Sequence, residues 1–187
     1  MNRREAISAV GWLLGGTLVG ADLLVACTSS PAKVNSLFDQ DQVALLNEVG
    51  ETILPATDTP GAKAADVGAF MAVMVQDCYK PEDQKVFMDG IKKLDEVSNE
   101  KYGKKFMKLD ASSRTALLTS LDAEQKEYMQ KKKHEEPSHY FRMMKELTLL
   151  GFFTSEVGAT KALRYVPVPG RYDGCIDYKK GDRAWAT

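Results

Sequence analysis

The feature that most constrains the fold is the spacing of apolar residues, which recur every three or four positions through most of the chain. From about residue 39 onward this period of 3.6 residues predicts a succession of helices. No segment alternates convincingly between apolar and polar residues, as a half-buried strand would. The sequence therefore predicts an all-α fold, a single irregular helical domain of about five or six helices.

Capping residues and prolines predict where these helices begin and end. Asp39 is a fair N-cap for a helix that Pro55 ends, and Pro81 suits the first turn of another helix. Asp110 or Ser113 can cap a further one. The expected segments are 40–54, with Val43, Leu46, Val49 and Ile53 on the apolar face; 67–78, with Phe70, Met71, Met74, Val75 and Cys78; 81–97, with Phe87, Ile91 and Leu94; a helix carrying Leu117, Leu118 and Leu121; a charged, solvated helix within 123–136; and 138–156.

The first 26 residues have the pattern of an export signal. Arg3 and Arg4 precede an uncharged, mildly apolar run that ends at Asp22. This run is shorter than the ~20 residues that a membrane-spanning helix needs. Two adjacent arginines before such a run are typical of the twin-arginine export route. Residues 1–26 are therefore predicted to be a twin-arginine signal peptide.

The residues around Cys27 resemble a bacterial lipobox, with small Ala26 at the cleavage position. Several acyl chains on this cysteine would form a durable anchor, since each buried CH₂ contributes ~0.8 kcal/mol. The alternative is an ordinary cysteine beside a generic cleavage site. We expect a periplasmic, lipid-anchored protein, with residues 27–36 as a tether and 37–187 as the folded domain. Thr28 supplies no aspartate retention signal, which favours the outer membrane.

The charge of the chain is balanced. Removing residues 1–26 takes away two basic and two acidic residues, so 25−2 basic against 26−2 acidic residues still give a net charge of −1. Nucleic acids and anionic bilayers both select proteins with a basic surface. The composition therefore argues against a nucleic-acid partner.

The chain shows no pattern of catalytic, cofactor-binding or metal-binding residues. His134 and His139 are five residues apart with Pro137 between them, so they do not share a helical face. No Gly-x-Gly-x-x-Gly follows a strand, and no Cys-x-x-Cys-His is present. Four carboxylates near the first turn are expected to cap helices or to face solvent: Glu48, Glu51, Asp58 and Asp66.

A tail of different composition is expected from about residue 159. Residues 165–175 contain two prolines and two glycines among aromatic side chains, a mixture that cannot continue a helix. An apolar tail without helical periodicity needs a surface to pack on. That surface is either its own domain or a partner, and the sequence leaves both alternatives open.

The two cysteines beyond Cys27 have three alternative states. Cys78 and Cys175 could bridge each other and close a loop of about 100 residues. Either could instead bridge to a partner chain or remain a free, buried thiol. Cys78 is expected to be buried because it lies on the apolar face of its helix, whereas Cys175 lies in the extended tail.

Three stretches together resemble a known family. They are residues 51–62 (ETILPATDTPGA) with 67–70 after them, residues 141–155, and residues 164–175. The sequences of these stretches and their order along the chain resemble the gluconate 2-dehydrogenase subunit 3 family. The resemblance covers residues 37–175. The twin-arginine start fits that family too.

The resemblance implies a partnership. Such small subunits accompany a large FAD-containing oxidoreductase subunit of the glucose-methanol-choline type, which oxidises a sugar or sugar-acid hydroxyl and passes electrons on, often to a cytochrome c. The small subunit is expected to aid maturation and twin-arginine export of this flavoprotein and to anchor it. FAD is thus expected in the partner, and no cofactor in this chain.

The expected docking surface combines the turn around residues 57–62 with the tail at residues 165–175. Its residues are Pro55, Asp58, Pro60, Gly61, Tyr165, Pro169, Gly170, Arg171, Tyr172 and Cys175. One alternative is a stand-alone envelope lipoprotein that binds a small ligand or another envelope protein. Another is that the chain is itself the dehydrogenase, and the missing cofactor fingerprints argue against it.

Overall fold

The computed structural model describes residues 33–168, 170–171 and 174–186. All described residues belong to one compact unit, which begins at Lys33. The predicted signal peptide and lipidation site, with Arg3, Arg4 and Cys27, therefore lie outside the described residues.

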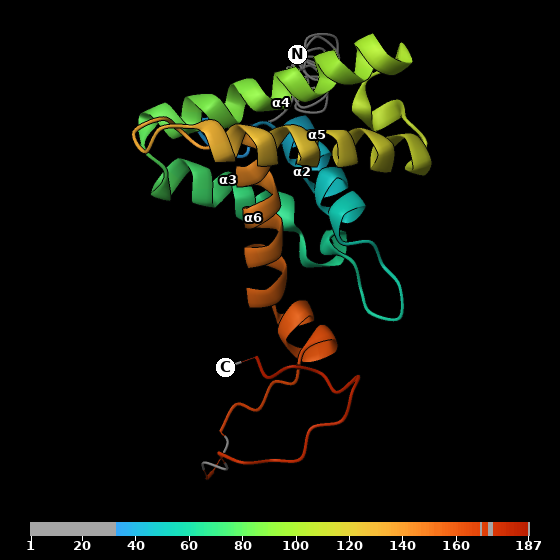
Figure 1. Cartoon of the computed structure of the whole chain (residues 1–187), viewed down its shortest axis with the longest axis vertical. Helices are drawn as coiled ribbons and strands as arrows, with labels where there is room; N and C mark the ends of the chain where they lie inside the picture. Colours follow the sequence, from blue (N-terminus) through green and yellow to red (C-terminus); the bar gives the residue numbers. More distant parts are fainter. Residues whose placement is uncertain (1–32, 169, 172–173, 187) are drawn as a thin grey trace, which may run out of the picture. The chain divides into compact units, whose positions relative to one another are not determined.

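The described residues form helices and turns (Figure 1). Their only β-structure is two isolated bridges, and none of them forms a β-strand. The prediction of an all-α fold is confirmed. In chain order the elements are α2 (Gln40–Ile53), the 3₁₀ turn η1 (Ala62–Ala65), α3 (Val67–Cys78), α4 (Pro81–Tyr102), the 3₁₀ turn η2 (Phe106–Lys108), α5 (Ala111–Lys131), α6 (Tyr140–Thr154) and the π turn η3 (Gly158–Ala162).

Helix α2 begins at the predicted cap. The Asp39 carboxylate accepts a hydrogen bond from the backbone N–H of Gln42 (2.8 Å), and the Gln42 side chain accepts one from the backbone N–H of Asp39 (3.0 Å). This reciprocal pair is a capping box, which satisfies two amides that the helix cannot. The helix ends just before Pro55, as predicted.

Helix α5 differs from the prediction. The segment capped by Asp110 and the charged segment 123–136 form one helix, which ends at Lys131. No proline or glycine separates the two segments, so the backbone continues without interruption. Gln125 is buried within the charged half, which is therefore not wholly solvated.

Helix α6 packs against the four other α-helices of the described residues and holds the core together. Its first residue approaches α4 closely: a Cβ at Gly90 would lie 2.4 Å from the Cβ of Tyr140. The aromatic ring of Phe38 meets Phe87 edge to face, with 6.1 Å between centroids. The largest fully buried side chains come from every α-helix of the unit or the residues just before one: Phe38, Phe87, Phe106, Phe141, Leu46, Met71, Leu94, Leu117, Leu121, Met144, Gln125 and Val49.

The folded unit begins earlier than the predicted boundary at residue 37. The Asn35 side chain donates to the carbonyl of Ala72 (3.0 Å), and the Ser36 N–H and hydroxyl both donate to Gln76 (2.9 and 2.8 Å). Residues 33–36 are thus held against α3 instead of serving as tether.

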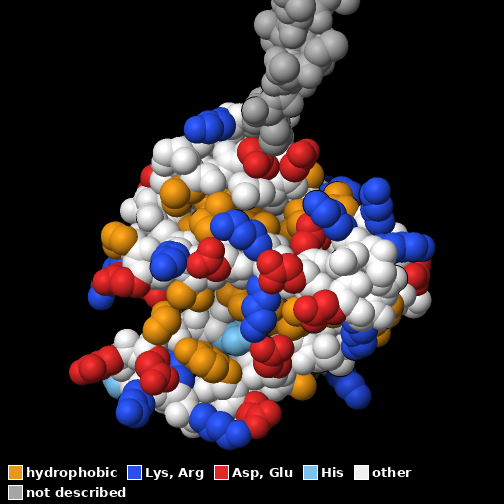
Figure 2. Space-filling model, turned by 90° about the horizontal axis from the view of Figure 1, so that it is seen from above, with side chains coloured by type: hydrophobic (Ala, Val, Ile, Leu, Met, Phe, Trp, Pro, Cys, Tyr) orange, Lys and Arg blue, Asp and Glu red, His pale blue; other side chains and the backbone are white. Residues whose placement is uncertain are grey.

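The side of the unit seen in Figure 2 carries acidic and basic side chains in close mixture. Ion pairs in α5 and between α4 and α5 include Lys93–Glu124 at 3.3 Å and Lys126–Asp122 at 2.7 Å. Across the described part of the chain, every helix is too short or too polar to cross a membrane.

Candidate docking site

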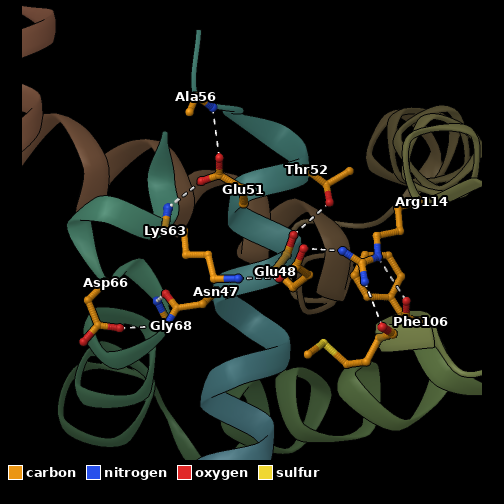
Figure 3. A network of polar contacts seen from close by, with 11 residues as sticks. Asn47, Glu48, Glu51, Thr52, Ala56, Lys63, Asp66, Gly68, Phe106 and Arg114 are labelled. Atoms are coloured by element: carbon orange, nitrogen blue, oxygen red, sulfur yellow. Dashed lines mark hydrogen bonds and ion pairs between the residues drawn. The ribbon is translucent and has the colours of Figure 1, made fainter. Parts of the chain in front are cut away.

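The loop between α2 and η1, residues 54–61, is held in one conformation by Glu51. The two carboxylate oxygens of Glu51 accept hydrogen bonds from the backbone N–H groups of Ala56 (2.9 Å) and Lys63 (2.8 Å), one on each side of the loop (Figure 3). At the base of the loop, the N–H of Ala62 donates to the carbonyl of Leu54 (2.9 Å). One side chain therefore binds both arms of the loop.

Gly61 is required by this arrangement. A Cβ at this position would lie 2.4 Å from both carboxylate oxygens of Glu51 and 2.6 Å from the backbone nitrogen of Ala56. Real Cβ atoms do not approach polar atoms so closely, so only glycine lets the carboxylate reach both amides. The predicted site residue Gly61 is thus buried and acts on the shape of the loop.

The tip of the loop faces solvent. Pro55 and Asp58 are exposed, and Pro60 is half-buried. The backbone N–H of Thr57 donates to the carbonyl of Thr59 (2.9 Å), which tightens the tip. The structure therefore brings these predicted site residues together on a fixed, exposed loop.

Glu48 lies one helical turn before Glu51 and joins three elements. Its carboxylate binds the Lys63 ammonium of η1 (2.8 Å) and the Arg114 guanidinium of α5 (Figure 3). The hydrogen bond from Lys63 and the charge of Arg114 lower the pKa of Glu48 below its usual 4.5, against the opposing effect of partial burial. The expectation that these carboxylates cap helices or face solvent is wrong for Glu48, whereas Glu51 does cap η1, because it accepts the N–H of Lys63 in the first turn.

Arg114 also ties the start of α5 to η2. Its guanidinium donates to the carbonyls of Phe106 (3.2 Å) and Met107 (2.8 Å) and lies over the Phe106 ring, 5.5 Å from the centroid. Sequence reasoning missed this residue because its main partner is 66 positions away. The one available signal was an arginine within an otherwise weakly charged helical start.

Asn47 fixes the start of α3 from the same helix. Its amide donates to the Asp66 carboxylate (2.7 Å), and its carbonyl oxygen accepts from the backbone N–H of Gly68 (2.7 Å). Asp66 adopts a left-handed backbone conformation with φ of 48°, and its side chain makes no cap bond to α3. This cap is therefore supplied by a residue of α2.

The tail begins later than predicted. Residues 158–162 form a π turn that the N–H of Leu163 closes by donating to the carbonyl of Gly158 (2.9 Å). A Cβ at Gly158 would lie 1.9 Å from the carbonyl oxygen of Phe152, so the turn can fold back on α6 only with glycine there. The extended part of the tail starts at residue 163.

The two ends of the extended tail meet. The N–H of Arg164 donates to the carbonyl of Ala184 (2.8 Å), and the N–H of Ala186 donates to the carbonyl of Arg164 (3.0 Å). The Arg164 guanidinium lies 4.8 Å from the centroid of the Trp185 ring, a cation–π contact. A cavity of about 500 Å³ at this closure is lined by residues that include Tyr165 and Arg183.

The apolar side chains of the tail are exposed. Val168 is 81% exposed and Tyr178 is 77% exposed, and three others are about half exposed: Tyr165, Ile176 and Trp185. The first alternative for the tail was that it packs on its own helical domain. The structure does not bury these side chains there. In Figure 1 the tail and the 54–61 loop both extend from the side of the unit opposite to α4.

The remaining predicted tail residues fall into two groups. Gly170 has a φ of +70°, which favours glycine, and Arg171 and Cys175 lie in exposed backbone. Pro169 and Tyr172 lie outside the described residues.

Cys78 and Cys175 are both free and exposed. The expectation that Cys78 is buried is wrong. It is the last residue of α3, and the next residue, Tyr79, is partly buried against the core. The side chains of the described residues include no group of three or more His, Cys, Asp or Glu positioned to share a metal ion.

Comparison with protein families identifies one match. The family model described as gluconate 2-dehydrogenase subunit 3 matches residues 40–170, from the first residue of α2 into the tail. Comparison with curated proteins and with solved structures finds no match. The match contains both the loop that Glu51 fixes and the start of the exposed tail. Since it covers well over half of the 187 residues, the chain belongs to the gluconate 2-dehydrogenase subunit 3 family.

Proposed function

We propose that this chain is a non-catalytic small subunit that binds a large FAD-containing oxidoreductase subunit of the glucose-methanol-choline type. Membership of the family makes it a subunit of a gluconate 2-dehydrogenase-type complex. The nature of the partner and its FAD belong to the proposal. In it, the partner oxidises a sugar or sugar-acid hydroxyl, and a cytochrome c takes up the electrons.

The observation that carries the proposal is the exposed tail. Five large apolar side chains of the tail face solvent, although the helical unit beside them has a well-packed core. Exposed aromatic side chains at this density are typical of surfaces that a partner covers. The contacts of Arg164 with Ala184, Trp185 and Ala186 join the two ends of the tail to each other. The tail therefore loses less conformational entropy on binding than a free segment would.

The 54–61 loop provides the second part of the proposed surface. It presents Pro55 and Asp58 from a backbone that Glu51 has already fixed. A loop that does not need to be ordered on binding loses little entropy, which favours a stable complex.

The charges of the tail favour an acidic surface on the partner. Residues 158–187 contain six basic residues (Lys161, Arg164, Arg171, Lys179, Lys180, Arg183) and three acidic ones (Asp173, Asp177, Asp182), hence +3. Residues 27–157 contain 17 basic and 21 acidic residues, hence −4. Complementary charges on the partner would orient the encounter.

Export and anchoring complete the proposal and rest on the sequence. Arg3 and Arg4 would direct the chain to the twin-arginine route, which carries folded proteins, so one signal would serve a pair assembled in the cytoplasm. A lipid on Cys27 would then hold the pair at the periplasmic side of a membrane, with the outer membrane favoured.

Purification of the tagged full-length chain from its native membranes tests the proposal. We expect a stoichiometric large subunit in the eluate, identified by mass spectrometry, and the absorbance spectrum of bound flavin. A solitary, colourless lipoprotein would overturn the proposal and favour a stand-alone envelope protein that binds a small ligand or another envelope protein.

A further inference from the structure

His139 lies at the start of α6, where residues of three helices surround its ring. The side chain is 8% exposed. Its ring centroid lies 5.5 Å from that of Tyr128 in α5 and 4.5 Å from that of Tyr140 in α6. Lys93 of α4 reaches the same place, with its ammonium 5.5 Å from the centroid of the Tyr140 ring. A group that can gain a proton is thus enclosed at a helix junction.

The His139 ring is the N-cap of α6. Its Nδ1 accepts a hydrogen bond from the backbone N–H of Phe141 (3.2 Å). A neutral imidazole has one donor and one acceptor nitrogen, so the ring proton must be on Nε2 while Nδ1 accepts. The cap therefore requires the neutral ring in one tautomer.

Nε2 faces a carboxylate that it does not reach. The distance from Nε2 to Glu124 Oε1 is 3.5 Å, longer than a normal hydrogen bond. Among the described residues, Nε2 is one of three buried side-chain polar atoms without a hydrogen-bond partner, and the other two are Gln125 Oε1 and Tyr140 Oη. A small movement of the ring toward Glu124 would give Nε2 a partner.

We propose that His139 is an acid-sensitive cap, in which a proton from solvent binds Nδ1, ends the bond from Phe141 N–H and moves the ring into an ion pair with Glu124. The neutral state holds the first turn of α6 through Nδ1, and the charged state holds Glu124 through Nε2. The two states exclude each other, because a protonated Nδ1 is a donor facing a donor.

The surrounding charges set the balance between these states. Glu124 of α5 attracts the charged ring, whereas Lys93 of α4 repels it and also binds Glu124 (3.3 Å). The positive end of the α6 dipole repels a cation at the cap. Tyr128 and Tyr140 contribute aromatic rings, and burial raises the pKa of Tyr140 above its usual range.

The direction of the pH effect follows from burial. Desolvation lowers the pKa of His139 below the ordinary 6.5, although Glu124 acts in the opposite sense. Between the two pKa values the unfolded chain binds more protons than the folded one, so stability is complete above pH 6.5 and is lost as the pH falls below it. Since α6 packs on α2, α3, α4 and α5 and leads into the tail, acid would loosen the element that carries the tail. The inference does not depend on the proposed function.

Thermal unfolding of the full-length protein between pH 7.5 and pH 5 tests this device. His139→Asn keeps a good capping acceptor that does not titrate. We expect the Tm of the wild type to fall by roughly 2–4 °C more than that of this variant over the interval. His134→Gln is the matched control: it removes the exposed histidine five residues earlier and should keep the wild-type pH dependence. Equal losses in the wild type and H139N would overturn the proposal.

Nuclear magnetic resonance of the His134→Gln variant gives a second, independent readout, because His139 is then the only histidine of the sequence. We expect the proton on Nε2 at pH 7.5 and a change of the Phe141 amide signal that titrates together with the ring. The opposite tautomer, or a Phe141 amide that does not respond to the titration, would contradict the proposal even if H139N failed to fold.

Discussion

At the scale of single residues, two glutamates of α2 perform different tasks one turn apart. Glu51 binds backbone N–H groups and shapes a loop, whereas Glu48 binds two cationic side chains and joins α2 to η1 and α5. The first task depends on local sequence and the second on a contact over a long distance in the chain. Substitutions at these positions should therefore have different consequences.

Gly61→Ala should open the 54–61 loop and lower stability. Its methyl group would occupy the space of the Glu51 carboxylate, which must then release the N–H of Ala56 or of Lys63. We expect a loss of about 1–3 kcal/mol in the free energy of unfolding, measured by denaturant titration. Thr57→Ala is the matched control, since this exposed residue takes part only through its backbone and should change stability little. Equal stability of the two variants would show that Glu51 does not fix the loop.

Glu48 and Arg114 should be energetically coupled in a way that depends on pH. A double-mutant cycle with Glu48→Gln and Arg114→Met is expected to give a coupling energy of about 0.5–3 kcal/mol at pH 7. Because the folded-state pKa of Glu48 is lowered, this stabilisation is complete above its ordinary value of 4.5 and is lost as the pH falls through the folded-state pKa. Urea titrations of the four proteins at pH 7 and at pH 3.5 measure it. Coupling that is zero at pH 7 would mean that solvent screens the pair.

The limits of sequence reasoning are clearest for these residues. The pattern predicts Asp39 as a cap and Gly61 as a turn residue, since both signals lie within a few positions of the feature that they control. The Glu48–Arg114 pair joins positions 66 apart, and nothing local marks either residue. The cap at His139 was missed because histidine is not among the usual capping residues and its burial arises from α4 and α5.

At the scale of elements, the helices differ in how far local signals define them. The bounds predicted for α3 are those observed, because its apolar residues recur at helical spacing from Val67 to Cys78. For α5 the change from apolar to charged residues is not a helix end, since composition alone does not break backbone hydrogen bonds. The π turn η3 escapes a search for a 3.6-residue period altogether, because it depends on the contact of Gly158 with Phe152.

The tail should be dispensable for folding but not for the complex. Its backbone hydrogen bonds at the closure join residues of the tail to one another, and its large apolar side chains are exposed. A chain that ends at Leu163 should therefore keep the helical circular dichroism and the Tm of the full-length protein to within a few degrees. The same truncation should abolish co-purification of the proposed large subunit. A truncated chain that unfolds would show that the tail stabilises its own domain, whereas one that still binds the partner would place the docking surface elsewhere.

At the scale of the whole molecule, charge is distributed unevenly along a chain that is almost neutral in sum. Residues 158–187 have a net charge of +3 and residues 27–157 a net charge of −4, and the two add up to only −1. Within the helical unit many charges are paired with each other, as in the network around Asp122, where Lys126 and Lys145 lower the pKa of the carboxyl to about 2. The tail thus carries a net positive charge beside its exposed aromatic side chains.

This separation predicts that the complex with the proposed large subunit weakens with salt. Rising ionic strength screens charges at a surface, so the dissociation constant measured by biolayer interferometry should increase between about 50 and 500 mM NaCl, mainly through a slower association. Reversing Lys179 and Lys180 to glutamate should weaken binding at low salt and flatten this dependence. Reversing Lys92 and Lys108, exposed in the helical unit, changes the net charge equally and should leave binding nearly unchanged. If both pairs of reversals weaken binding to the same extent, the net charge of the chain governs the encounter and the tail has no special part in it.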